Sequence, residues 1–259
     1  MHSTDTSAPE SGASPPDAAT RAPRSGSREG APRPPGVLAA ALLIARKDLS
    51  IEYRTRSAFL AALAFALVSV VIFRFAWDQT TVTALDLAPG VLWVIFTFSG
   101  LLGLFRSFGV ELAEGALDGL LGSPVSREAI FLGKFSANVL FVIAVQAVTV
   151  PAVVLFYNLS IGSAWLPLAG VTILASVGLV AVGTLFSAMA LNTRMAELLL
   201  PVLTLPFFVP VVVPAAQATV ALLGGRPIAE ALPWIRVLLA FDLVFLFACT
   251  SVFRFTVEE

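Results

Sequence analysis

Long apolar stretches with few charges constrain this chain more than any motif does. A bilayer core about 30 Å thick needs about 20 apolar residues in a helix that rises 1.5 Å per residue. The third and fourth stretches follow one another, and Asn158, Gly162 and Pro167 mark the turn between them. Together with the other four they predict membrane spans at residues 57–77, 87–105, 129–157, 165–191, 198–222 and 233–255.

Composition agrees with that interpretation. Hydrophobic residues make up 58% of the chain, charged residues 13%, and the mean hydropathy is +0.90, far from the averages of soluble domains. The alternating pattern of a membrane β-barrel is absent, so helices must satisfy the backbone hydrogen bonds. The predicted fold is therefore an all-α membrane protein with six transmembrane helices.

The chain before the first span divides into two parts. Residues 1–36 are rich in Pro, Ser, Ala and Gly and contain no apolar run, which predicts a disordered tail without a cleavable signal peptide. Residues 37–259 form the predicted transmembrane domain. Within it, residues 37–56 have an apolar front half and a charged back half, with Glu52 and Arg56 spaced for an i,i+4 pair. We expect an interfacial helix there; the alternative is an extension of the first span.

The distribution of basic residues predicts the orientation, because Lys and Arg are retained in the cytoplasm. With both termini cytoplasmic, Arg74, Arg226 and Arg236 lie outside. Leaving aside the four arginines of the tail, nine basic residues then lie inside: Arg46, Lys47, Arg54, Arg56, Arg106, Arg127, Lys134, Arg194 and Arg254. This excess favours the orientation with both termini in the cytoplasm.

The segment from Arg106 to Lys134 is the one charge-dense interruption between spans. Taken as a helix over residues 108–121, at 100° per residue, it places Glu111, Glu114 and Asp118 on one side and leucines on the other. Residues 122–124, Gly-Ser-Pro, end that helix, and Ser126 is placed to cap the next one.

Two surroundings suit such an acidic stripe. The helix could lie on the membrane with its acids facing water. However, a cytoplasmic leaflet attracts basic segments, so three carboxylates fit a basic protein surface better than a lipid surface. We therefore expect a cytoplasmic helix that contacts another protein.

Residues that perform chemistry are nearly absent. There is no phosphate-binding Gly-x-x-x-x-Gly-Lys-Ser/Thr loop, the sole histidine is His2 in the tail, and Cys249 is the only cysteine. No spacing resembles a metal site, and no serine has a histidine base. These observations predict no catalytic and no metal-binding residues. We expect a transport subunit that takes its energy from a separate ATPase.

Two intramembrane features suggest either motion or structure. Four prolines recur in the fifth span, Pro201, Pro206, Pro210 and Pro214, and each removes a backbone donor. They predict a hinge or a short re-entrant element near residues 215–222, and the alternative is a static kink. Asp242 lies near mid-bilayer in the sixth span, and a structural hydrogen-bonding role is favoured there over a proton relay.

Several ordered pieces of the sequence resemble one family. They include the runs 88–94, Ala-Pro-Gly-Val-Leu-Trp-Val, and 117–121, Leu-Asp-Gly-Leu-Leu, then Ser-Pro-Val at 123–125 and Leu-Gly-Lys at 132–134. The Leu-Leu-Leu-Pro run at 198–201, the Pro-Trp-Ile run at 233–235 and the Ala-Phe-Asp-Leu run at 240–243 continue the series. In order and spacing these resemble the heme exporter protein B family, the CcmB permeases of type-2 ABC exporters, over residues 37–259.

The resemblance implies a subunit of the system that attaches heme to c-type cytochromes, in the bacterial inner membrane. Its implied partners are a cytoplasmic CcmA-like ATPase that binds ATP, CcmC-like and CcmD-like membrane subunits, and a periplasmic heme chaperone. Heme is the candidate substrate of the complex. The complex could contain two copies of the permease, and we expect no nucleic-acid partner. In this family the helix at residues 108–121 would be the coupling helix, the element that docks on the ATPase. Its docking residues would be Glu111, Leu112, Glu114, Gly115, Leu117, Asp118, Leu120, Leu121 and Pro124.

Axial ligands for heme iron are scarce in the spans. Met189, Cys249 and Tyr157 are scattered, and no histidine lies in the membrane. We therefore expect this chain to transmit ATPase motion without binding heme iron. The alternatives are a type-2 permease for another substrate, a membrane scaffold, and an ATPase-independent carrier with Asp242 and the fifth span as its ion site.

Overall fold

The computed structural model describes residues 36–77, 82–114, 125–190 and 196–256, and their side chains except those of 105–114, 188–190, 196–201 and 253–256. These ranges form α-helices and one short 3-10 helix, and they contain no strand. The α-helices are α1 (Val37–Thr55), α2 (Ser57–Ala76), α3 (Ala84–Glu114), α5 (Arg127–Tyr157), α6 (Trp165–Ala190), α7 (Ala196–Leu223) and α8 (Ile228–Thr256). The 3-10 helix η1 (Gly162–Ala164) precedes α6.

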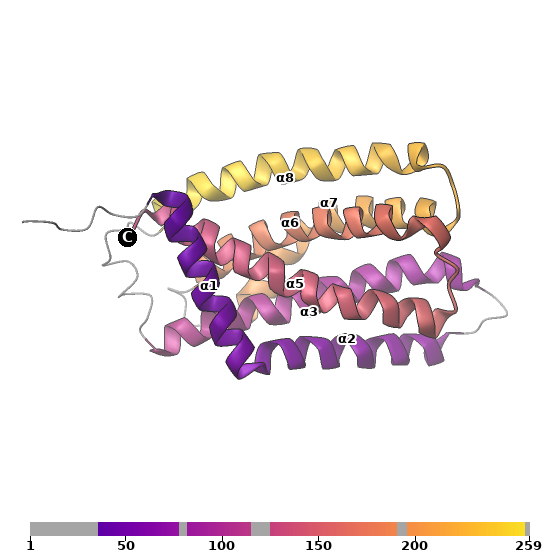
Figure 1. The fold of residues 1–259 in the computed structure, drawn as a ribbon, viewed down its shortest axis with the longest axis horizontal. Coiled ribbons are helices and arrows are strands. Elements are labelled where there is room, and N and C mark those ends of the chain that lie inside the picture. The colour runs from indigo at the N-terminus through magenta and orange to yellow at the C-terminus, as the bar shows by residue number, and fades with distance from the viewer. Residues whose placement is uncertain (1–35, 78–81, 115–124, 191–195, 257–259) are drawn as a thin grey trace, which may run out of the picture. The chain divides into compact units, whose positions relative to one another are not determined.

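Six of these helices are long and apolar enough to cross a membrane, which confirms the predicted fold class. Successive helices from α2 to α8 run in alternating directions, and α1 lies across them at one end (Figure 1). The turn between α5 and α6 forms where it was expected: α5 ends at Tyr157, and Asn158 takes a left-handed conformation, φ 52°. Pro167 lies in the first turn of α6, where its missing N–H costs no hydrogen bond.

Two helices differ from the prediction. The second membrane span was expected to end at Phe105 and the apolar span does end at Leu104, but the helix that carries it, α3, continues without a break to Glu114. The first residues of the helix predicted for 108–121 therefore belong to α3. In addition, α8 begins at Ile228, five residues before the predicted start at Pro233. Charged residues ended the apolar windows in both places, whereas a helix needs only backbone hydrogen bonds and continues past the apolar core.

The elbow between α1 and α2 is a single residue. Arg56 takes a left-handed conformation, φ 54°, ends α1 and begins α2. Glu52 does not pair with Arg56 as its spacing predicted: its Oε1 accepts a hydrogen bond from the Phe59 backbone N–H at 2.7 Å. Because Phe59 lies in the first turn of α2, this carboxylate satisfies one of the donors that every helix leaves free at its start.

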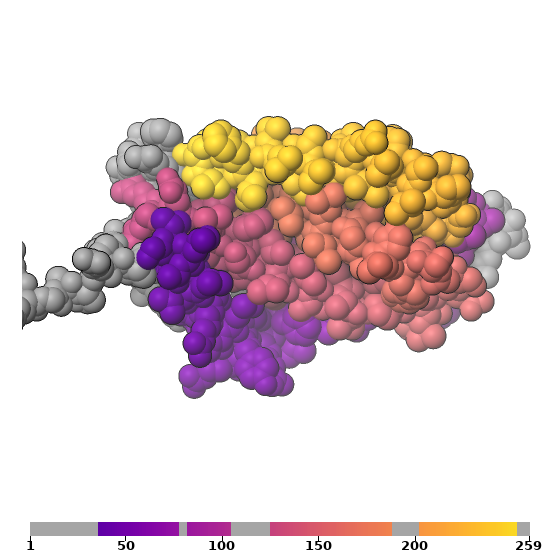
Figure 2. All heavy atoms as spheres, turned by 45° about the horizontal axis from the view of Figure 1, so that its top comes forward, coloured from indigo at the N-terminus to yellow at the C-terminus, as the bar shows by residue number. Residues whose placement is uncertain are grey.

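Small residues and buried aromatic rings hold the helices together. The buried side of α2 is Ala58, Ala62, Ala66 and Val70, spaced four apart, which lets its backbone approach its neighbours closely. Trp93 of α3 is fully buried, and its Nε1 donates to Thr219 Oγ1 of α7 at 3.0 Å. Helix α6 packs against both α7 and α8, while much of α8 is visible along one face of the molecule (Figure 2).

Candidate coupling end and intramembrane polar groups

The coupling helix predicted for residues 108–121 covers the end of α3 and part of the connection to α5, and the structure describes only its first part. Glu111, Leu112 and Glu114 belong to the last turns of α3. Residues three apart are neighbours on a helix surface, as Glu111 and Glu114 are here. The other predicted docking residues, Gly115, Leu117, Asp118, Leu120, Leu121 and Pro124, lie outside the described residues.

Helix α5 begins immediately after that segment, with the predicted cap. Ser126 has an extended backbone, and its side chain accepts a hydrogen bond from the Ala129 N–H at 3.3 Å. Glu128 lies in the first turn, where a negative charge is stabilised by the helix dipole. The capping role expected for Ser126 is confirmed, and it fixes the residue at which α5 begins.

Removing this cap is expected to destabilise the protein slightly. Ser126→Ala deletes one acceptor at the start of α5, which costs about 1 kcal/mol and lowers the melting temperature by about 2–4 °C. Thermal unfolding in detergent, followed by maleimide labelling of Cys249, measures this. Ser160→Ala in the exposed α5–α6 connection is the matched control. An unchanged midpoint for Ser126→Ala would show that other contacts position α5.

Helix α1 is fixed to α5 by an ion pair that sequence reasoning missed. Lys134 is 1% exposed, and its Nζ lies 3.5 Å from Asp48 Oδ2. Asp48 also contacts Lys47, whose Nζ lies 3.2 Å from Asp48 Oδ1. The sequence analysis counted Lys134 only as a cytoplasmic charge, and no sequence signal pairs residues so far apart in the chain.

Gly133 makes this contact possible. A Cβ atom built on Gly133 would lie 2.7 Å from Ile44 Cβ and 2.8 Å from the Ala41 carbonyl oxygen. Both distances are shorter than atoms tolerate, so only glycine admits α1 at this separation. Ile44 then packs in one buried cluster with Phe131 and Cys249, which joins α1, α5 and α8.

Asp242 is buried on α8, at 4% exposure. Neither carboxylate oxygen has a hydrogen-bond partner within the ranges that the structure describes. Its neighbours are apolar or small: a Cβ atom built on Gly178 of α6 would lie 2.5 Å from Asp242 Oδ1, and 3.2 Å from Val211 of α7 and from Phe241. Arg236 is exposed, in accordance with its position on another side of the helix. Asp242 thus lies where α6, α7 and α8 meet.

The prolines of the fifth span do not break it. Helix α7 runs from Ala196 to Leu223 through all four prolines, so the re-entrant element expected near residues 215–222 is wrong. Pro206 and Pro210 are exposed and Pro214 is buried, while the side chain of Pro201 is not described. An exposed proline ring can face lipid, and the missing N–H leaves only one carbonyl per ring without its helical donor.

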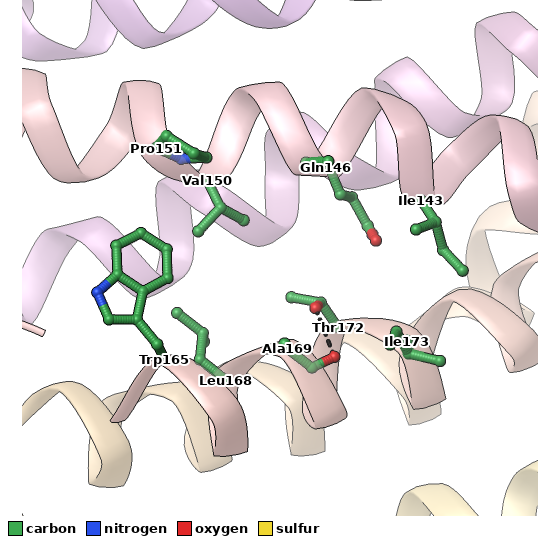
Figure 3. A pocket seen from close by; sticks show the side chains of 10 residues that line it. Ile143, Gln146, Val150, Pro151, Trp165, Leu168, Ala169, Thr172 and Ile173 are labelled. Carbon is green, nitrogen blue, oxygen red and sulfur yellow. Dashed lines mark hydrogen bonds between the residues drawn. The ribbon is translucent and has the colours of Figure 1, made fainter. Parts of the chain in front are cut away.

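A polar seam joins α5 and α6. Ser176 donates to Gln146 Oε1 at 2.9 Å, and Asn138 Nδ2 donates to Thr184 Oγ1 at 3.4 Å. Gln146 extends from α5 into a pocket of about 190 Å³ between the two helices, with Trp165 at one end and Thr172 opposite (Figure 3). Sequence reasoning missed these residues because it searched for ionisable groups. The spacing of polar residues along α5 could have predicted this seam, since Asn138, Gln146 and Thr149 fall within about 80° on a helical wheel.

The residues considered as iron ligands are not brought together. Tyr157 ends α5 and stacks on Trp77 with ring centroids 5.6 Å apart. Cys249 packs beside Phe131, which lies about 39 Å from Tyr157 along α5 at 1.5 Å per residue. The side chain of Met189 is not described. In the described ranges no three His, Cys, Asp or Glu side chains form a group that could hold a metal.

Comparison with known proteins finds one family. Residues 39–257 match the CcmB protein family. Heme exporter protein B of Paracoccus denitrificans is 33% identical over 178 residues, which is 69% of this chain and 80% of that protein. Heme exporter protein B of Pseudomonas aeruginosa is 25% identical over 220 residues, which is 84% of this chain and 97% of that protein.

Proposed function

This chain belongs to the CcmB protein family, and we propose that it is the membrane permease subunit of a complex that exports heme for cytochrome c maturation. The observation that carries the proposal is the family match over nearly all of the described residues, on a chain with six membrane-spanning helices. It is a multi-pass membrane protein and is not itself an enzyme. A separate ATPase subunit would bind and hydrolyse ATP.

We place the protein in the bacterial inner membrane with both termini in the cytoplasm. The basic residues support this orientation. Arg54 and Arg56 lie at the junction of α1 and α2, and Lys134 lies near the start of α5, whereas Arg74 lies in the last turn of α2 and Arg226 between α7 and α8. The starts of α2 and α5 lie toward one end of the bundle, and the end of α2 and the α7–α8 connection lie toward the other (Figure 1). The segment between α3 and α5 then faces the cytoplasm, where an ATPase could contact it. Membrane subunits that handle heme and a periplasmic heme chaperone would complete the system.

The contacts around α5 support a coupling role for that segment. The start of α5 is capped by Ser126, and seven to eight residues later it is fixed to α1 through Gly133 and Lys134. Phe131 also contacts the cluster that includes Cys249 of α8. A displacement of the α3–α5 connection would therefore reach α1 and α8 together, because these packed contacts leave little room for independent movement.

Heme would be handled by partner subunits without iron coordination by this chain. The support is the separation of Tyr157 from Cys249 along the spans and the absence of histidine from them. The purified chain should show no axial-ligand absorbance when heme is added. A ligand spectrum that disappears in Met189→Leu or Tyr157→Phe would contradict this.

The function is tested by genetic replacement. A bacterium lacking its own permease subunit should lose c-type cytochromes, detected by heme staining of separated proteins, and expression of this chain should restore them. The affinity-purified chain should carry an ATPase subunit whose hydrolysis depends on it. Transport by the purified chain alone in liposomes, without any ATPase, would overturn the proposal and favour a carrier.

Reversal of the acidic stripe should weaken the ATPase contact. Changing Glu111, Glu114 and Asp118 to lysine places three positive charges toward a surface proposed to be basic, and we expect at least tenfold less co-purified ATPase, equivalent to about 1.4 kcal/mol. Quantitative immunoblotting of the purified complex measures it. The control variant carries Asp86→Lys and Glu230→Lys, which reverse acids in the first turns of α3 and α8, away from the predicted docking segment. Undiminished association of the triple variant would exclude this segment as the docking surface.

A further inference from the structure

A second pocket lies at the elbow between α1 and α2. It measures about 420 Å³ and is enclosed by the end of α1, the start of α2 and the middle of α5. Its walls are mainly apolar, with Leu49, Leu60, Leu140, Phe141 and Ala144 among the lining residues. Leu60 is 56% and Leu140 51% exposed, so the pocket opens toward the surroundings of the helices.

The polar rim of the pocket carries one positive charge, on Arg56, that no ion pair neutralises within the described part of the chain. Arg56 donates from Nε to the Tyr53 carbonyl oxygen at 3.3 Å, and its guanidinium lies over the Tyr53 ring, 5.2 Å from the centroid. Glu52, the one acid on the rim, uses Oε1 to accept from Phe59 N–H. Among the described residues no ion pair joins Glu52 to Arg56. The arginine is therefore positioned by Tyr53 and has its two terminal amino groups left for an external anion.

The apolar side of α1 shows what surrounds this pocket. Leu38, Leu42 and Tyr53 are each at least 70% exposed and fall within about 60° on a helical wheel. Arg54 lies about 100° or more from all three, and the buried Ile44 lies on a third side. Arg46 borders the apolar side, about 20° from Tyr53, and the exposed Leu43 lies beside Arg54, so the exposed surface of α1 combines apolar and basic side chains. Such a helix, with its remaining side packed on protein, is typical of the membrane surface. Leu49 and Tyr53 extend the apolar side into the pocket.

We propose that this pocket binds one phospholipid, whose phosphate pairs with Arg56 and one of whose acyl chains lies against Leu60, Leu140 and Ala144. A guanidinium binds phosphate oxygens through two parallel N–H donors, and no acyl chain could satisfy it. The apolar wall in turn offers nothing to a free phosphate ion. Only a molecule with both parts complements both surfaces. The site does not depend on the transport function proposed above.

The first part of the test asks whether the charge of Arg56 holds the phosphate, with Arg54 as the comparison. The purified full chain is stripped of lipid in detergent, titrated with phosphatidylglycerol and analysed by native mass spectrometry. We expect one retained lipid, about tenfold weaker binding for Arg56→Gln, and unchanged binding for Arg54→Gln, which removes the same charge outside the pocket. Equal losses in both variants would mean general attraction to a basic surface and would overturn the site.

The apolar arm fills the pocket. Ala144→Phe places a ring among the lining residues and should abolish retention, whereas Val148→Phe, one turn later on α5 and 42% exposed, should not. Diacylglycerol, which lacks the phosphate, should bind no better to the wild type than to Arg56→Gln. Retention that survives Ala144→Phe, or a wild type that retains no phospholipid, would contradict the proposal. Unchanged maleimide labelling of Cys249 confirms that each variant is folded.

Discussion

A leucine in place of Gly133 is expected to separate α1 from α5 and to destabilise the folded chain by about 4 kcal/mol. The position has no space for a side chain, because a Cβ atom would lie 2.8 Å from the Ala41 carbonyl oxygen and 2.7 Å from Ile44 Cβ. The carbonyl belongs to the backbone of α1 and cannot rotate away. The whole helix must therefore move.

The movement would also break the ion pair beside it. Lys134, at 1% exposure, would lose its contact with the Asp48 carboxylate, and breaking a buried ion pair costs about 3–5 kcal/mol. Lys134→Met should be milder than Gly133→Leu, because it removes the buried charge while Asp48 keeps its contact with Lys47. A larger loss of stability in Gly133→Leu than in Lys134→Met would show that steric displacement of α1 adds to the loss of the ion pair.

Cys249 makes this prediction measurable without an introduced cysteine. It is the only cysteine, is 1% exposed, and packs in the cluster with Ile44 and Phe131. Displacement of α1 should uncover it, and labelling by a maleimide should be about 1,000-fold faster in Gly133→Leu, which corresponds to about 4 kcal/mol of easier opening. Gly90→Leu in α3, where nothing lies within 4 Å, is the control. Equal labelling rates in both variants would refute the tight α1–α5 contact.

The spans and their turns could be predicted from the sequence because they depend on local information. Hydropathy over about 20 residues selects the segments that enter a bilayer, and Ser126 and Asn158 end or begin helices through contacts with their immediate neighbours. The extension of α3 to Glu114 was missed because hydropathy identifies the membrane core and not the length of a helix. Arg106 and Glu111 interrupt apolar character without interrupting backbone hydrogen bonds.

The contacts that position the candidate site could not be predicted because they join distant residues. Nothing near Lys134 in the sequence indicates Asp48, and nothing near Asp242 indicates Gly178. Both contacts depend on how the helices pack, which small residues permit but do not specify. The acidic stripe of the predicted coupling helix remains a prediction, since its second half lies outside the described residues. A local feature such as the Ser126 cap was therefore easier to predict than contacts between helices.

Gly178 and Asp242 should behave as one unit in a double-mutant cycle. Gly178→Ala places a methyl group where its carbon would lie 2.5 Å from Asp242 Oδ1 and 3.2 Å from Val211 and Phe241. We expect a loss of about 2 kcal/mol, although alanine is the better helix former, because α6, α7 and α8 must separate to admit it. Gly170→Ala, on the same helix with nothing within 4 Å, should be neutral or slightly stabilising.

Asp242→Ala should suppress the Gly178→Ala defect, because it removes the oxygen that the new methyl group meets. It also removes a buried carboxylate whose oxygens have no hydrogen-bond partner in the described ranges, so its own cost should be small. The expected coupling energy is about 2 kcal/mol, from thermal unfolding of the two single variants and the double variant. Additive losses would show that the two residues do not share this space. If Asp242 only fills space, the double variant should also regain c-type cytochrome production in the replacement strain. Recovery of stability without recovery of cytochromes would assign the carboxylate a direct part in transport.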